Sequence, residues 1–247
     1  MSRTPPGFSP PMSPELVTEH IPITAEGLKE VSFTLAQIPN HLKGEHEPGG
    51  PDAPFRPEQL LAVLELATAK HRGSGLSFVL FPEMSIPLLF LDDMTELLNR
   101  TDFPSNFVVS FGLEYISLAE FSELLHNSQN SSEYEKLWVA YVQSRLGPTK
   151  KSVMVNCAVV LCKTADGVQH FVQVKLGGDQ GHRASKDELL GGKFVHLFEG
   201  RNLAFVSLIC EDLIYRDSSS SLVASLRREA SRMRLEEGKT LDFVFVL

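Results

Sequence analysis

The chain has 247 residues, of which 43% are hydrophobic and 22% charged, close to the average for globular proteins. Disorder of the whole chain is therefore excluded, and at roughly 150 residues per domain the length favours one large domain over two. The formal net charge of −8 at pH 7 gives no general attraction to nucleic acid or to a membrane surface, so we expect neither as a partner. No run of 18 apolar residues is present, and no membrane-spanning helix is predicted.

The first 14 residues contain five prolines and show no apolar periodicity. We therefore expect residues 1–30 to form a flexible, proline-rich tail and residues 31–247 to form the folded domain. The start of the chain lacks the apolar core of a secretory signal, and a cytoplasmic location is expected.

Strands and helices alternate along the domain, which predicts an α/β or mixed α+β sheet protein. The predicted strands cover residues 31–38, 76–81, 107–113, 154–161, 170–176, 194–198, 203–210 and 242–247. The predicted helices cover residues 59–71, 88–98 and 221–237. Several strands are almost entirely apolar, which is typical of strands that are covered on both faces.

A helical insertion at about residues 117–151 interrupts this pattern, with helices expected over 118–126 and 133–146. The second of these helices carries one apolar face, formed by Tyr134, Leu137, Trp138, Tyr141 and Val142. We expect this face to pack onto the core, in preference to binding a ligand.

The three cysteines, Cys157, Cys162 and Cys210, cannot all be paired in disulfides and fit a reducing compartment. Cys157 and Cys162 would face opposite sides of one strand, which is poor geometry for a metal site. The histidines are scattered, and neither a phosphate-binding loop nor a dinucleotide-binding loop is present. We therefore expect no cofactor and no metal.

Glu83 follows the apolar strand 76–81 and Pro82, which has no amide hydrogen to continue a strand ladder. Ligands of open α/β sheets bind near the carboxyl ends of strands, so a carboxylate at this position is a candidate general base. For a glutamate considered alone, a solvated side chain is the commoner outcome.

Two further polar residues close predicted strands. Lys175 ends the run 170–176, where it lies either on an exposed sheet face or near developing negative charge. Cys210 ends the apolar run 203–210, where it is either a small buried hydrophobe or a nucleophile at a strand-to-turn elbow. A cysteine nucleophile needs a nearby base or cation, which the other two residues would supply.

Glu83, Lys175 and Cys210, each at the end of a strand and in this order, resemble the Glu–Lys–Cys set of the carbon–nitrogen hydrolase, or nitrilase, superfamily. The segments 32–37, 111–114 and 156–160 are also similar to family segments, and the last of these precedes the family's lysine. The resemblance implies a four-layer αββα sandwich that assembles into a homodimer or a higher homo-oligomer. The family's domain continues past the strand resembled by 242–247, so we expect the sandwich to be incomplete at the C-terminus.

The resemblance also implies a reaction. Cys210 would attack the carbon of a small-molecule amide or nitrile, Glu83 would take the thiol proton, and Lys175 would stabilise the intermediate. Glu114, in the segment 111–114, would orient Lys175 or a water molecule. The run Cys210-Glu211-Asp212 is similar to glutamine-hydrolysing domains of the superfamily and favours an amide over a nitrile. The residues that follow Lys175 and Cys210 depart from the family pattern. The alternative is therefore an inactive nitrilase-like module for ligand binding or assembly.

Overall fold

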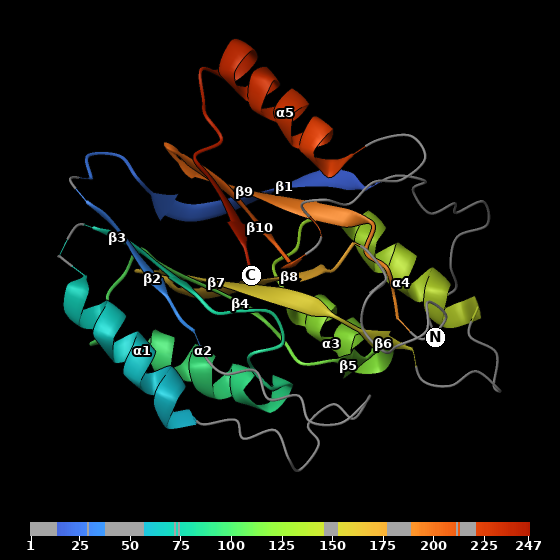
Figure 1. Cartoon of the computed structure of the whole chain (residues 1–247), viewed down its shortest axis with the longest axis horizontal. Coiled ribbons are helices and arrows are strands. Elements are labelled where there is room, and N and C mark those ends of the chain that lie inside the picture. The colour runs from blue at the N-terminus through green and yellow to red at the C-terminus, as the bar shows by residue number, and fades with distance from the viewer. Residues whose placement is uncertain are drawn as a thin grey trace.

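The computed structural model describes residues 14–28, 30–37, 57–71, 73, 75–145, 153–176, 189–210, 212 and 221–247. It is a mixed α/β protein, as the alternation of predicted strands and helices indicated (Figure 1). No helix in this described part is both long enough and apolar enough to cross a membrane.

The larger sheet has five strands in the order β2-β3-β4-β7-β8. These strands are β2 (Val31–Leu35), β3 (Leu76–Leu80), β4 (Phe107–Gly112), β7 (Cys157–Thr164) and β8 (Gly167–Val174). Strands β2, β3 and β4 are parallel, β7 is antiparallel to β4, and β8 is antiparallel to β7. Strands β3, β4 and β8 therefore run in the same direction, and their carboxyl ends lie at one edge of the sheet.

The second sheet has four strands in the order β1-β9-β10-β11. They are β1 (Glu15–Thr24), β9 (Phe194–Arg201), β10 (Leu203–Leu208) and β11 (Phe243–Val246). Strands β9 and β10 form an antiparallel hairpin, with β1 parallel to β9 and β11 parallel to β10. A short ladder, β5 (Ile116–Ser117) with β6 (Met154–Val155), flanks the insertion.

Helices cover the outer faces of the two sheets (Figure 1). The larger sheet is covered by α1 (Pro57–Lys70), the 3₁₀ turn η1 (Leu88–Phe90), α2 (Leu91–Asn99) and α3 (Leu118–Asn127). Helix α4 (Glu133–Arg145) packs beside α3 and contacts β9 through Trp138 and Phe194. The smaller sheet is covered by α5 (Leu222–Arg232), which continues as a π-helical turn, η3 (Met233–Glu237). Between the sheets, aromatic rings from both sides meet, including Phe78 of β3 and Phe205 of β10 with centroids 5.3 Å apart. The layers therefore follow the order helix, sheet, sheet, helix.

The prediction of a tail over residues 1–30 is wrong for residues 15–24, which form β1 and pair with β9 along most of its length. Ile21 and Ile23 point into the core between the sheets and alternate with the exposed side chains of His20 and Pro22. This two-residue period is the strand pattern, and the proline-rich composition of the first 14 residues conceals it. Residues 1–13 lie outside the described part.

The segment predicted as a helical insertion joins β5 to β6 through α3 and α4. Ser117 and Glu120 form a capping box that starts α3. Trp138 of α4 is buried against Phe194 of β9, as the predicted packing of this face requires, whereas Tyr134 remains partly exposed.

A buried polar cluster that the sequence did not predict ties the insertion to the second sheet. His196 of β9 places Nδ1 2.8 Å from Glu19 Oε1 of β1 and Nε2 3.2 Å from Glu135 Oε2 of α4. Asn130 donates to the same Glu135 oxygen at 2.9 Å, and the Ser131 amide donates to Glu19 at 2.9 Å. Burial lowers the pKa of His196, but the carboxylates of Glu135 and Glu19 outweigh it and raise the pKa to about 9.

The cluster predicts a specific dependence of stability on pH. Because the folded pKa of His196 lies above the unfolded value of 6.5, its contribution is complete below that value and is lost as the pH rises through about 9. We expect the loss in unfolding free energy caused by His196→Gln to be about 3 kcal/mol larger at pH 6 than at pH 10. Urea denaturation at both pH values measures this difference. His126→Gln, at an exposed position of α3, is the matched control. An equal effect of His196→Gln at both pH values would contradict a charged His196.

Candidate active site

The three residues predicted to carry chemistry all follow the carboxyl ends of strands. Glu83 follows β3, Lys175 directly follows β8, and Cys210 follows β10. Two hydrogen bonds join the two sheets here. The Ser110 hydroxyl of β4 bonds the Ser207 hydroxyl of β10 at 2.7 Å, and Gln173 Nε2 of β8 donates to the Ser207 carbonyl at 3.1 Å. The carboxyl ends of β4, β8 and β10 therefore gather at one end of the sandwich.

Glu83 and Lys175, 92 positions apart, are in direct contact. Lys175 Nζ lies 2.9 Å from Glu83 Oε1, and Asn156 Nδ2 donates to the same oxygen at 2.6 Å. The Lys175 side chain is only 4% exposed and the Glu83 side chain 16%. A pair this sheltered interacts more strongly than a surface salt bridge, because little water screens it.

The backbone of Glu83 is held against the end of β4. A Cβ atom on Gly112 would lie 2.6 Å from Glu83 Cα, so no larger residue fits here without displacing the turn. The Gly112 amide donates to the Pro82 carbonyl at 3.3 Å, and its own carbonyl accepts from Ser85 at 3.0 Å. The close approach of these two backbones sets the position of the carboxylate.

The backbone of Lys175 is held on both sides. Its amide donates to the Asn156 carbonyl at 2.9 Å, and its carbonyl accepts from the Gly192 amide at 2.7 Å. A Cβ atom on Gly192 would lie 2.4 Å from the Val174 carbonyl oxygen, so this approach also needs a glycine. The ammonium group therefore extends from a well-anchored strand end.

Cys210 lies in a tight turn after β10. Its φ of 42° is in the left-handed region, which is strained for a residue other than glycine and is common at functional turns. The turn is closed by a hydrogen bond of 2.9 Å from the Asp212 amide to the Ile209 carbonyl, and the Cys210 amide donates to the Leu247 carbonyl after β11 at 3.1 Å. Cys210 is exposed, whereas Cys157 and Cys162 are buried and burial raises the pKa of both thiols. Of the three thiols, Cys210 is therefore the one that is exposed to solvent.

Asp212 joins the Cys210 turn to the end of β8. Its Oδ1 accepts from the Leu176 amide at 2.8 Å and its Oδ2 accepts from the Ile209 amide at 3.1 Å. Burial raises the pKa of its carboxyl group to about 7, although both amides and the charge of Lys175 act in the opposite direction. One side chain thus links the residue after Lys175 to the residue before Cys210.

Glu114, the predicted supporting glutamate, lies in the loop after β4. Its Oε1 accepts from the Leu88 amide at 3.2 Å, and its own amide donates to the Ile86 carbonyl at 3.0 Å. These contacts support the loop that follows Glu83. The predicted action of Glu114 on Lys175 or on a water molecule stays a prediction.

Sequence reasoning missed Asn156 and Asp212 as site residues. Asn156 immediately precedes the apolar strand β7, and Asp212 stands two positions after Cys210. A polar residue beside an apolar strand is a weak signal, and the burial of both side chains is visible only in the folded chain.

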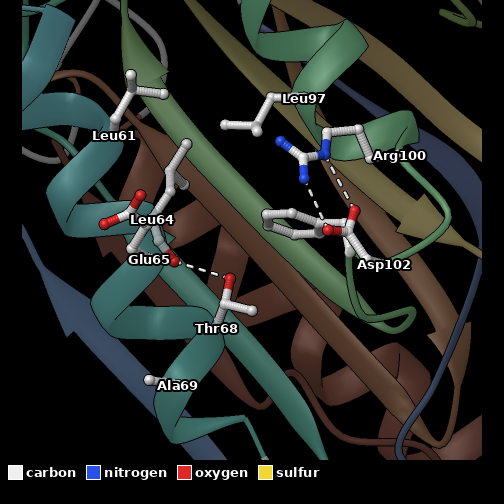
Figure 2. Close-up of a pocket in the computed structure, with 9 residues that line it drawn as sticks. Leu61, Leu64, Glu65, Thr68, Ala69, Leu97, Arg100 and Asp102 are labelled. Atoms are coloured by element: carbon white, nitrogen blue, oxygen red, sulfur yellow. Dashed lines mark hydrogen bonds and ion pairs between the residues drawn. The ribbon is translucent and has the colours of Figure 1, made fainter.

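Within the described ranges, no three His, Cys, Asp or Glu side chains are grouped so that they could hold a metal ion. A cavity of about 400 Å³ lies between α1 and the end of α2, away from the strand ends described above (Figure 2). Three polar residues that line it are bonded to other groups of the protein: Arg100 pairs with Asp102 at 2.7 Å, and Thr68 Oγ1 donates to the Leu64 carbonyl at 2.8 Å. None of the three predicted catalytic residues lines it.

Comparison with known proteins gives limited similarity. No protein-family model matches the chain, and no curated protein matches it. Among solved structures, the chain is similar to a glutamine-dependent NAD+ synthetase from Acinetobacter baumannii in complex with ADP, with 16% sequence identity and a TM-score of 0.40. The match covers 77% of this chain and 28% of that one, so the chain spans less than a third of that protein's length.

Proposed function

We propose that the protein is a hydrolase of the nitrilase type that cleaves a non-peptide carbon–nitrogen bond, an amide in preference to a nitrile, through a cysteine thioester. The observation that carries the proposal is the buried contact of 2.9 Å between Glu83 and Lys175. It is supported by Asp212, which ties the strained turn of Cys210 to the segment after Lys175. The order of layers agrees with the αββα sandwich that the resemblance to this family implies.

In the proposed reaction, Glu83 removes the proton from the Cys210 thiol and the sulfur attacks the carbonyl carbon of the amide. The carbonyl oxygen gains a negative charge, which Lys175 stabilises. The carbon–nitrogen bond then breaks while Glu83 returns the proton to the nitrogen, and ammonia leaves from a primary amide. A water molecule, deprotonated by Glu83, attacks the thioester. The carbon–sulfur bond breaks, Glu83 returns this proton to the Cys210 sulfur, and the acid is released.

Lys175 is suited to this role by its surroundings. A buried lysine remains charged when a carboxylate lies beside it, and its positive charge favours both a nearby thiolate and an oxyanion. Because Asn156 and Gly192 hold the backbone of Lys175, the ammonium group is positioned before substrate binds. Such preorganisation makes electrostatic stabilisation effective.

Release of ammonia from a panel of primary amides, glutamine and nitriles tests the proposal. We expect at least one amide to be hydrolysed, with one carboxylic acid formed for each ammonia released. Pretreatment with one equivalent of iodoacetamide should stop the reaction. Failure to hydrolyse any member of a broad panel, or turnover that survives complete alkylation of Cys210, would overturn it.

Thiol reactivity distinguishes the enzyme from an inactive module of the same fold. In a background in which Cys157 and Cys162 are both alanine, we expect iodoacetamide to label Cys210 at pH 7 at least about ten times faster in the folded protein than in urea. Exposure alone cannot produce this result, because the unfolded chain exposes the thiol fully. A rate in the folded protein equal to or below the rate in urea would favour a binding or assembly role.

A further inference from the structure

Asn156 touches both members of the buried ion pair. It lies between β6 and β7 and is 3% exposed. Its side-chain Nδ2 donates to Glu83 Oε1 at 2.6 Å, while its backbone carbonyl accepts from the Lys175 amide at 2.9 Å. A single residue therefore fixes the position of the Glu83 side chain relative to the backbone of Lys175.

The side-chain oxygen of Asn156, Oδ1, shows that this arrangement has a cost in stability. This oxygen is buried, and no residue in the described part of the chain donates a hydrogen bond to it. A buried acceptor without a donor lowers stability, and most buried polar groups avoid this state. The amide cannot turn around to relieve it, because Oδ1 would then face the Glu83 carboxylate. An apolar residue would avoid this loss, so the amide at this position is better explained by Glu83 than by packing.

Glu83 Oε1 accepts from both the Asn156 amide and the Lys175 ammonium group. Removal of the Asn156 side chain would therefore take one of these two donors from Oε1 and leave the contact with Lys175.

We propose that Asn156 is a positioning residue for the general base: it fixes Glu83 Oε1 beside Lys175 and so holds the carboxylate in place for proton transfer. The inference rests on the proposed function. In the step concerned, the Sγ–H bond of Cys210 breaks as an O–H bond forms on the Glu83 carboxylate, and the same proton later passes to the leaving nitrogen. Asn156 itself contacts neither substrate nor the transferred proton.

Asn156→Asp tests the inference with a side chain of the same shape. It puts a second carboxylate beside Glu83, and two carboxylates at this distance retain a proton between them. We expect kcat to fall at least about 100-fold, KM to change less than about threefold, and the acid limb of the pH profile to move upward by one pH unit or more. Asn99→Asp, the same replacement at an exposed position of α2, should leave all three unchanged.

Asn156→Ala keeps the test falsifiable if the aspartate variant does not fold. It removes the donor together with the buried Oδ1, to which no described residue donates, so we expect the melting temperature to stay within a few degrees of that of the wild type. The kcat should fall about tenfold, and the acid limb should move in the same direction by a smaller amount. Loss of activity with an unchanged pH profile would show a structural role only and would overturn the inference.

A titration that does not depend on turnover separates this inference from the proposed function. In protein labelled with ¹³C at the glutamate carboxyl carbons, the Glu83 signal is identified by its absence in Glu83→Gln. Its titration midpoint should be higher in Asn156→Ala than in the wild type, whether or not any amide is hydrolysed. Identical midpoints would overturn the positioning role, whereas a shifted midpoint without turnover in the wild type would overturn only the hydrolase.

Discussion

Replacement of Cys210 by alanine is expected to lower amide turnover at least about 1,000-fold, because no other group can form the thioester. The fold should persist, since the side chain is exposed and contributes little to the core. We expect the unfolding free energy to change by less than about 0.5 kcal/mol. Ammonia release and urea denaturation on the same preparation measure both quantities.

Two further variants sharpen this result. Cys162→Ala, at a buried position of β7, removes a thiol from the core and should reduce stability while leaving kcat per folded molecule unchanged. Cys210→Gly should be as inactive as the alanine variant but more stable by about 1 kcal/mol, because glycine adopts a φ of 42° without strain. Residual turnover of Cys210→Ala above one tenth of the wild-type value would rule out Cys210 as the nucleophile.

Replacement of Lys175 by methionine is expected to have the second largest effect, because it removes both a buried cation and its contact with Glu83. Turnover should fall about 100- to 1,000-fold, as expected for loss of a group that stabilises an oxyanion. Stability should fall by about 2 kcal/mol, since Glu83 is left partly buried with Asn156 but without its ion-pair partner.

The double variant Lys175→Met with Glu83→Gln separates these two effects. Removal of both charges should recover most of the lost stability and none of the turnover, and the double-mutant cycle should give a coupling energy of about 1–3 kcal/mol. Lys70→Met, at an exposed position near the end of α1, is the matched control. A coupling energy near zero would mean that the contact of 2.9 Å contributes nothing to the folded state.

Most strands and helices could be predicted from the sequence, because their signals are local. Strand β3 is an apolar run ended by a proline, and α3 begins at a capping box. Strand β1 is the exception, because amino-acid composition alone did not predict it. Its alternating isoleucines follow a proline-rich segment, and β9, the strand with which it pairs, begins about 180 residues later. Its pairing is a long-range event that no local window contains.

The candidate site was also predictable only where its signals are local. A polar residue at the exit of an apolar strand can be recognised in the sequence, and Glu83, Lys175 and Cys210 each have this placement. Neither Asn156 nor Asp212 could be found in this way, because their importance comes from the groups they bond. Asn156 bonds Glu83, 73 positions away, and Asp212 bonds Leu176, 36 positions away.

The sequence by itself determined the class of fold, the ends of the strands and the three residues at which chemistry was expected. It did so because hydrophobic periodicity, proline and capping act over a few residues. Only the tertiary structure decided which strand ends meet, that Lys175 is buried against Glu83, and that His196 joins β1 to the helical insertion. Those contacts depend on the register between two sheets, which the packing of Phe78 against Phe205 and the bond between Ser110 and Ser207 help to set across the core.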